Sequence, residues 1–175
     1  MMAGENIALE LGAAQTTSLG FRIRDYRAAD FDRLWEIDQQ CFPPGIAYTQ
    51  MELNGFITRR NAITLVAEFD GSDDKAIAGF AVAHPVRRKY GRILTLDILP
   101  RARRSGLATR LMEICEQRLR LLGCSHIYLE TAVDNEPALR LYQKLGYQVL
   151  RRLPGYYHSH NLDAFQMGKE LASSP

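Results

Sequence analysis

The chain has 175 residues, of which 46% are hydrophobic and 24% charged, a composition typical of one globular domain with a substantial core. Its formal net charge of +2 is too small to indicate general binding to nucleic acid, and no apolar run approaches the roughly 20 residues that cross a membrane. The three cysteines, Cys41, Cys115 and Cys124, are odd in number and lack metal-ligand spacing, so neither a disulfide framework nor a metal site is expected.

The N-terminal residues 1–18 are rich in small and polar residues without a clear period, and we expect a flexible tail there. They lack the basic start and the continuous apolar segment of a secretory signal, which favours a cytoplasmic protein. No later change in composition marks a linker. We therefore predict a single domain over residues 19–175.

Strand and helix patterns alternate through this domain. The predicted order is strand 21–24, helix 31–41, helix 49–60, strands 62–69, 76–84 and 93–99, helix 104–122, strand 126–131, helix 136–145, and strands 147–152 and 164–169. Asp30 and Thr49 are candidate N-caps, Gly123 and Gly146 stand where helices end, and residues 70–74 form the turn of a hairpin. This order predicts an α+β sheet with helices on its faces.

A basic turn, Arg103-Arg104-Ser105-Gly106-Leu107-Ala108, joins the strand at 93–99 to the next helix and has the form R-x-x-G-x-A. Gly106 lets the backbone approach a ligand, and the free N–H groups of the helix N-terminus favour an anion. Such turns also start helices without binding anything. Alone, the motif leaves phosphate binding and a plain helix start equally open.

A second motif follows the next strand and has the form N-x-x-A-x-x-x-Y-x-x-x-G-Y, from Asn135 to Tyr147. Together the two motifs resemble the acetyl-CoA core of the GCN5-related N-acetyltransferase superfamily. Within it, the chain is similar to protein N-terminal acetyltransferases of the ribosomal-protein alanine acetyltransferase type. That closer similarity extends from about Phe21 to Leu171 and rests on Cys41-Phe42-Pro43 with Tyr48, on Glu130, and on Tyr156-Tyr157 with residues 163–167.

The resemblance implies a mixed, mostly antiparallel sheet with a central splay between the two core strands, helices on both faces, and acetyl-CoA as acetyl donor. The pantetheine arm would lie in the splay, and the pyrophosphate would lie on the basic turn. Asn135 can cap its helix, and by resemblance it also binds the CoA arm. The expected cofactor residues are Leu96, Ile98, Arg103, Arg104, Ser105, Gly106, Leu107, Ala108, Thr109 and Asn135.

Acetyl transfer to an amine needs a neutral nucleophile and a proton for the leaving thiolate. The resemblance places the catalytic base at Glu130, on a strand where Tyr128, Glu130 and Ala132 share one face. A solvent-facing glutamate paired with an arginine is the alternative. The family motif assigns the acid to Tyr142, since a phenol is protonated at neutral pH. A half-buried aromatic that only packs is the alternative there.

The acceptor is harder to predict. A protein α-amino group has a pKa near 8 and is more readily neutral at pH 7 than a lysine near 10.4, which favours an N-terminal amine. By resemblance, Tyr156 and Tyr157, in the loop predicted over residues 153–163, would hold the peptide backbone. Phe42, Pro43 and Tyr48 would form the opposing side. Pro154-Gly155 departs from the family pattern and weakens the case for a ribosomal protein as substrate.

Positive charge gathers in three clusters, at residues 87–92, 101–104 and 151–152. The second lies on the basic turn and suits the phosphates of CoA, whereas the other two are interpreted as a solvated basic edge.

The predicted function is acetyl-CoA-dependent acetylation of the α-amino group of a protein or peptide N-terminus by direct transfer. A small-molecule amine as acceptor stays open, and acidic residues such as Glu52, Asp97 and Asp163 around the cleft would favour it. A non-catalytic module that binds CoA, or nucleic acid through its arginines, is the last alternative.

Overall fold

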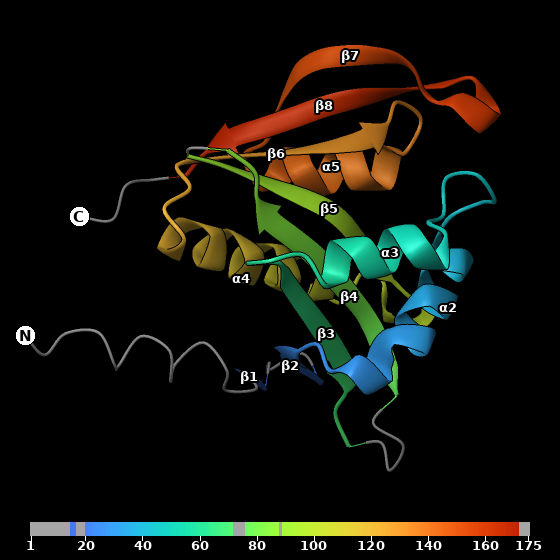
Figure 1. The fold of residues 1–175 in the computed structure, drawn as a ribbon, viewed down its shortest axis with the longest axis vertical. Helices are drawn as coiled ribbons and strands as arrows, with labels where there is room; N and C mark the ends of the chain where they lie inside the picture. Colours follow the sequence, from blue (N-terminus) through green and yellow to red (C-terminus); the bar gives the residue numbers. More distant parts are fainter. Residues whose placement is uncertain (1–14, 17–19, 72–75, 88, 172–175) are drawn as a thin grey trace, which may run out of the picture.

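The computed structural model describes residues 15–16, 20–71, 76–87 and 89–171, and an eight-stranded sheet runs through it (Figure 1). The sheet has the order β1-β2-β3-β4-β5-β6-β8-β7, and its pairs are antiparallel except for β5 with β6. The strands are β1 (Gln15–Thr16), β2 (Phe21–Asp25), β3 (Ile63–Phe69), β4 (Ile77–Pro85), β5 (Tyr90–Ile98), β6 (His126–Ala132), β7 (Gln148–Tyr157) and β8 (Leu162–Glu170). The predicted mixed, mostly antiparallel sheet is confirmed.

The splay between β5 and β6 is also confirmed. The two parallel strands pair only over three residues, from Tyr90↔His126 to Arg92↔Tyr128. Beyond Arg92, β5 continues to Ile98 paired with β4 alone, while β6 continues to Ala132 paired with β8 alone. Beyond this point the facing edges of β5 and β6 do not pair with each other. Their backbone N–H and C=O groups are therefore available to hydrogen-bond a ligand.

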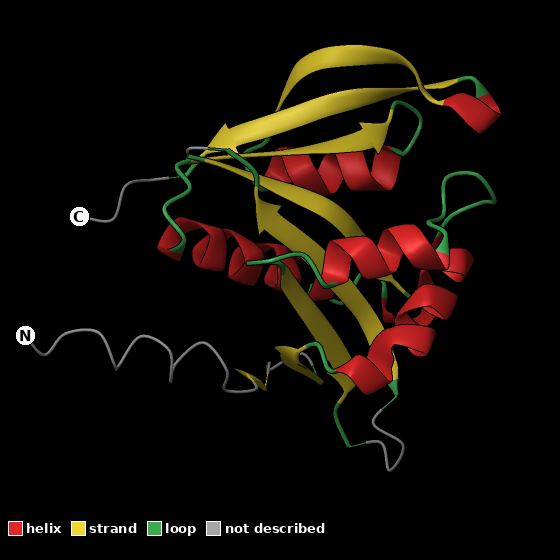
Figure 2. Ribbon diagram, viewed as in Figure 1, coloured by secondary structure: helices red, strands yellow, loops and turns green. Residues whose placement is uncertain are grey.

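The helices cover both faces of the sheet (Figure 2). The α-helices are α2 (Phe31–Cys41), α3 (Gln50–Ile57), α4 (Leu107–Leu121) and α5 (Glu136–Lys144), and the 3₁₀ helices are η1 (Ala28–Asp30), η2 (Pro100–Ala102) and η3 (His158–His160). Leu34 and Leu53 of α2 and α3 share one core cluster with Phe80, whereas Leu111 of α4 and Tyr142 of α5 belong to another. Each fully buried large apolar side chain contributes roughly 1.5–3 kcal/mol.

The helix ends mostly follow the predicted signals. Thr49 caps α3 in a reciprocal pair with Glu52, and Gly123 follows α4 with the positive φ of 87° that ends a helix without steric cost. Asp30 is not the predicted side-chain cap of α2. Its carboxylate instead accepts hydrogen bonds from the buried guanidinium of Arg24 at 2.7 Å and from the N–H of Arg27, because Arg24 needs a buried anion.

The predicted loop over residues 153–163 is wrong. Strand β7 continues through Tyr156 and Tyr157, and only η3 separates it from β8. Pro154 and Gly155 resemble a turn in sequence, but here they form an irregularity in the ladder, between Leu153↔Ala164 and Tyr157↔Leu162, after which pairing resumes. Both tyrosines are therefore held on a strand end.

Some predictions fall on parts of the chain outside the description. Gln15–Thr16, within the predicted tail, pair with Ile23 and Arg22 of β2. Residues 1–14 and 17–18 of that tail, residues 72–74 of the predicted turn, and Arg88 lie outside the described residues. Among the helices that are described, none has the length and apolar character needed to span a membrane.

Candidate active site

A cleft of about 1040 Å³ opens where β5 and β6 separate. Its lining comes from the sheet, from the N-terminal part of α4, from the length of α5, from the segment between α2 and α3, and from the end of β7. The predicted residues that it brings together are Phe42, Pro43, Tyr48, Leu96, Ile98, Arg103, Arg104, Gly106, Ala108, Thr109, Glu130, Asn135, Tyr142 and Tyr157. Ser105, Leu107 and Tyr156 are not among its lining residues.

The basic turn forms one end of the cleft. Arg104 and Gly106 both have positive φ, 58° and 84°, so the chain folds back tightly before α4 begins. Ala108 and Thr109 line the cleft in the first turn of α4, where N–H groups lack intrahelical acceptors. This geometry gives an anion-binding concavity with the helix dipole behind it. Ser105 instead donates its hydroxyl to the carbonyl of Ala102 at 2.7 Å.

The free edge of β5 forms the floor. The carbonyl of Leu94 accepts the Tyr48 hydroxyl at 3.2 Å, and the carbonyl of Ile98 accepts Nε of Arg103 at 3.0 Å. Leu96 lies between them and has no such side-chain partner in the described part of the chain. Leu96 and Ile98 were both predicted to pair with the pantetheine arm. The Ile98 carbonyl already accepts a hydrogen bond from Arg103, so the backbone of Leu96 is more available to a ligand.

Glu130 lies at the splay with its side chain only 8% exposed. Its Oε2 accepts Nε of Arg92 at 3.0 Å, and its Oε1 accepts Nε2 of Gln166 at 2.8 Å. The alternative was a glutamate that faces solvent and pairs with an arginine. The structure contains the arginine pair, but the Glu130 side chain does not face solvent. Arg92 also donates to the Tyr156 hydroxyl at 3.0 Å, which keeps Tyr156 close to the cleft without lining it.

Tyr142 projects from α5 into the same cleft and is 8% exposed. Burial raises the pKa of its phenol well above the ordinary value of 10.0. Its ring contacts that of Tyr147, with 5.9 Å between centroids, but within the described residues its hydroxyl has no hydrogen-bond partner. A protonated phenol without a protein partner is free to donate to a ligand.

Two segments close the acceptor side. Ser159 of η3 donates its hydroxyl to the carbonyl of Gly45, between α2 and α3, at 2.9 Å. A Cβ on Gly45 would lie 2.3 Å from that hydroxyl oxygen, and Gly45 has a φ of +87°, so only glycine fits here. Tyr48 is fixed from both ends, because its N–H donates to Asp38 at 2.8 Å while its hydroxyl binds Leu94.

Sequence reasoning did not predict three sets of partners around the site. Arg92 was only part of a charge cluster, although the β5–β6 register places it beside Glu130, and Gln166 is the direct partner of Glu130 in the β6–β8 register. Asp38 and Asp97 form the third group, a buried carboxyl pair beneath Tyr48. Burial raises the pKa of Asp38 to about 6, and burial together with the neighbouring carboxylate raises the pKa of Asp97 well above its ordinary value.

The comparisons with known proteins agree with this geometry. The model of the acetyltransferase (GNAT) family matches residues 31–147. The chain belongs to the GNAT family. It is therefore an acetyl-CoA-dependent N-acetyltransferase, and the resemblance noted from its two motifs is confirmed.

Relatives of this GNAT acetyltransferase cover nearly the whole domain. An N-alpha-acetyltransferase of Sulfurisphaera tokodaii is 27% identical over 163 residues, which span 86% of this chain and 93% of that protein. The solved structure of Ard1 from Thermoplasma volcanium is 26% identical with a TM-score of 0.78, over 88% of this chain and 99% of that one. The ribosomal-protein-S18-alanine N-acetyltransferase of Escherichia coli, 19% identical with a TM-score of 0.76 over 89% and 96% of the chains, shows the shared fold.

Proposed function

We propose that this GNAT acetyltransferase acetylates the α-amino group of a protein or peptide N-terminus, with Glu130 as the base and Tyr142 as the acid. One observation carries the assignment of roles. The buried carboxylate of Glu130 and the partnerless phenol of Tyr142 line one cleft at the point where β5 and β6 separate. An acid and a base on either side of one reaction centre are what amide formation from a thioester requires.

The cleft fits acetyl-CoA, which when bound supplies the thioester whose acetyl group is transferred. The N–H groups at the start of α4 and the guanidinium of Arg104 would hold the phosphates. The free edge of β5 at Leu96 would pair with the amides of the pantetheine arm. The side-chain Oδ1 of Asn135 already accepts the N–H of Ala138 as the cap of α5, so the side-chain NH₂ group remains for the cofactor.

Glu130 is oriented for proton removal. Because Arg92 and Gln166 each bind one of its oxygens, the carboxylate is held in one direction while further lone pairs stay available to an ammonium or a water. An α-amino group with a pKa near 8 needs only a modest base at neutral pH. On the other side, Oη of Tyr142 holds the proton that the departing sulfur takes up.

The lining of the cleft supports a peptide over a small polycation as acceptor. Phe42, Pro43, Tyr48 and Tyr157 provide apolar and aromatic contact on the acceptor side. Glu52, Asp97 and Asp163 do not line the cleft, and Glu130 and Asp134 are the acidic residues that do so in the described part of the chain. The relative from Sulfurisphaera tokodaii is itself named an N-alpha-acetyltransferase.

Thiol release from acetyl-CoA tests the proposal. We would compare short peptides with free and blocked N-termini, polyamines and free amino acids. Wild type, Glu130→Gln and Tyr142→Phe would be assayed beside Glu36→Gln, a matched change at an exposed glutamate on α2. We expect turnover only of free N-termini and a roughly 10²-fold or larger loss in both site variants. Turnover confined to small amines, or full activity in both site variants, would contradict the proposal.

A further inference from the structure

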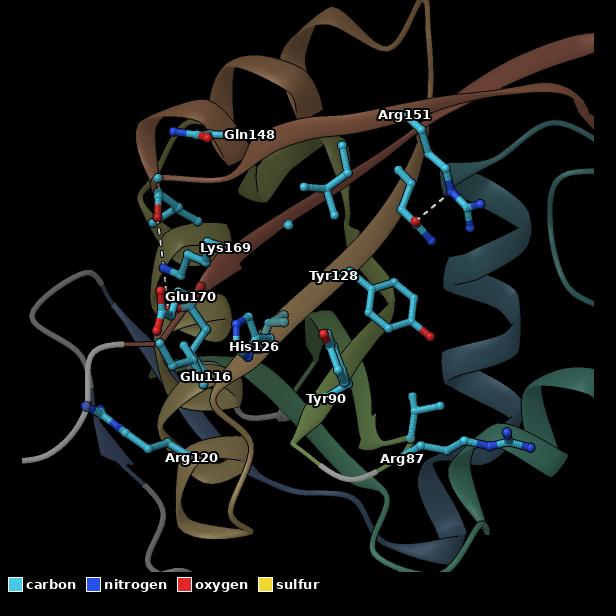
Figure 3. A pocket seen from close by; sticks show the side chains of 18 of the residues that line it. Arg87, Tyr90, Glu116, Arg120, His126, Tyr128, Gln148, Arg151, Lys169 and Glu170 are labelled. Carbon is cyan, nitrogen blue, oxygen red and sulfur yellow. Dashed lines mark hydrogen bonds and ion pairs between the residues drawn. The ribbon is translucent and has the colours of Figure 1, made fainter.

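Two arginines from different basic clusters, Arg87 and Arg151, lie outside the lining of the cleft, and the fold brings them together. Arg87 precedes β5 and Arg151 belongs to β7, yet both line a second cavity of about 1090 Å³ (Figure 3). This cavity lies on β6 and β8. Figure 1 shows α2 and α3 over β3 to β5 but not over this part of the sheet. Arg87 and Arg151, distant in sequence, thus line one cavity that α2 and α3 leave uncovered and whose other side is formed in part by α4.

Aromatic rings lie between the two arginines. In the view of Figure 3, Tyr128 and Tyr90 lie between Arg151 above and Arg87 below, and these four side chains are called the basic belt from here on. Tyr90 is 48% exposed, and its ring lies against His126 with 5.2 Å between centroids. Tyr128 is half-buried, whereas Arg87 and Arg151 are exposed. Aromatic and guanidinium groups arranged in this way offer apolar contact together with hydrogen bonds to carboxylates.

The acidic residues of the cavity lie away from the basic belt. Glu116 and Glu170 are on the opposite side of the view in Figure 3, and Glu116 forms an ion pair with Lys169 at 2.7 Å. The basic belt itself carries positive charge only. An anionic group is therefore the charge-complementary ligand.

Hydrogen bonds connect the basic belt to the proposed base. Nε of Arg151 donates to Gln166 at 3.0 Å, and Gln166 in turn donates to Glu130 at 2.8 Å. At the other end, Tyr90 lies level with His126, which precedes Glu130 by four residues on β6, or about 13 Å at roughly 3.3 Å per residue. Arg151 is the register partner of Gln166, which is the register partner of Glu130, so it lies two strands away, about 10 Å at roughly 4.8 Å per strand. An extended chain with its amine at Glu130 would therefore meet Arg151 near its third residue and Arg87, beyond Tyr90, near its sixth.

We propose that the basic belt binds the acceptor polypeptide beyond its acetylated end and selects carboxylate side chains near its third and sixth residues. The inference rests on the proposed function, because it takes the position of the N-terminal amine at Glu130 as its origin. Arg151 would pair with the nearer carboxylate and Arg87 with the farther one, while Tyr128 and Tyr90 contact the chain between them. A nucleic acid fits less well, because the basic belt begins at the base that serves the amine.

Octapeptides test this site. The set would share one sequence with a free N-terminus and carry aspartate at position 3, at position 6, at both or at neither, with a fifth peptide carrying lysine at both. We expect each aspartate to lower KM about two- to fivefold at low salt, because surface charge pairs are individually weak, and the effect to fade in about 0.5 M NaCl. The value of kcat should change much less.

Matched variants separate the two ends. Arg151→Ser should abolish the preference at position 3, Arg87→Ser the preference at position 6, and the double change to glutamate should turn the preference toward the lysine peptide. Arg33→Ser, which removes an exposed arginine of α2, serves as control and should keep all preferences. Arg151→Ser could also disturb Glu130 through Gln166, but that effect would change the KM of every peptide alike. The ratio of KM values between two peptides is therefore the quantity to compare.

The outcomes are distinguishable. Turnover of all five peptides with equal KM would overturn the basic belt as a peptide site while the proposed function stands. No turnover of any peptide would overturn both. Competition by a short single-stranded oligonucleotide that is lost in the same variants, without a charge preference among peptides, would assign the basic belt to nucleic acid and overturn the inference.

Discussion

The buried carboxyl pair of Asp38 and Asp97 makes the stability of the protein depend on pH. The two residues are 0% and 1% exposed. Oδ1 of Asp38 and Oδ2 of Asp97 have no hydrogen-bond partner among the described residues. The pKa of Asp97 is raised first by burial and then by the neighbouring Asp38 carboxylate. Two buried carboxyl groups that influence each other in this way ionise together only at a large cost, so we expect them to share one proton. Around the pair, Glu52 of α3 adds negative charge, and Cys41 and Arg103 face it from α2 and the basic turn.

The size of the effect follows from the raised pKa of Asp38. A change from 3.8 to about 6 corresponds to about 3 kcal/mol. Since the folded state binds the proton more tightly, this contribution to the free energy of unfolding is fully present below about pH 4 and is lost as the pH rises through about 6. The raised pKa of Asp97 adds a loss of the same sign.

Asp97→Asn replaces the shared proton with a permanent N–H donor. We expect the variant to be more stable than wild type by about 1–3 kcal/mol at pH 8 and to show no such gain at pH 5. Urea unfolding of both proteins between pH 5 and 8 measures this, with Glu36→Gln as an exposed control that should keep the wild-type profile. Parallel profiles for Asp97→Asn and wild type would refute the shared proton.

Two further predictions concern the edges of the cleft. Gly45→Ala should lower the free energy of unfolding by about 1–3 kcal/mol and raise the KM for peptides, because the new Cβ would meet the Ser159 hydroxyl and the φ of residue 45 is positive. Gly55 lies in open space on α3, so Gly55→Ala should raise the free energy of unfolding by up to about 1 kcal/mol. Thermal unfolding of the two variants decides this, and equal effects would contradict it. Arg104→Ser should raise the KM for acetyl-CoA about three- to tenfold at nearly constant kcat, and an unchanged KM would remove Arg104 from the phosphate site.

The sequence predicted what local signals determine. The order of elements, the Thr49 cap and the core position of Cys115 follow from periodicity and from capping chemistry that act over a few residues. The wrong loop over residues 153–163 came from the same reliance on local signals. Pro154 and Gly155 are strong turn formers, but pairing with β8 on both sides of them keeps the strand intact.

The partners of the site could not be predicted, because they depend on strand register. Arg92 and Gln166 reach Glu130 from two neighbouring strands, 38 residues before it and 36 after it. The Asp38–Asp97 pair joins a helix to a strand across the core, and nothing in either local sequence indicates that the two carboxyls meet. The motifs predicted a cofactor end of the cleft, whereas only the fold shows which residues surround Glu130, the proposed base.

The most direct test of the central claim is to locate the transferred acetyl group. A peptide with one free α-amino group and one internal lysine would be incubated with acetyl-CoA and the enzyme, and fragment masses would assign the product. The account predicts a single acetyl group on the α-amino nitrogen with wild type, and almost none in the same time with Glu130→Gln or Tyr142→Phe. Acetylation of the lysine alone, or equal product with all three proteins, would contradict it.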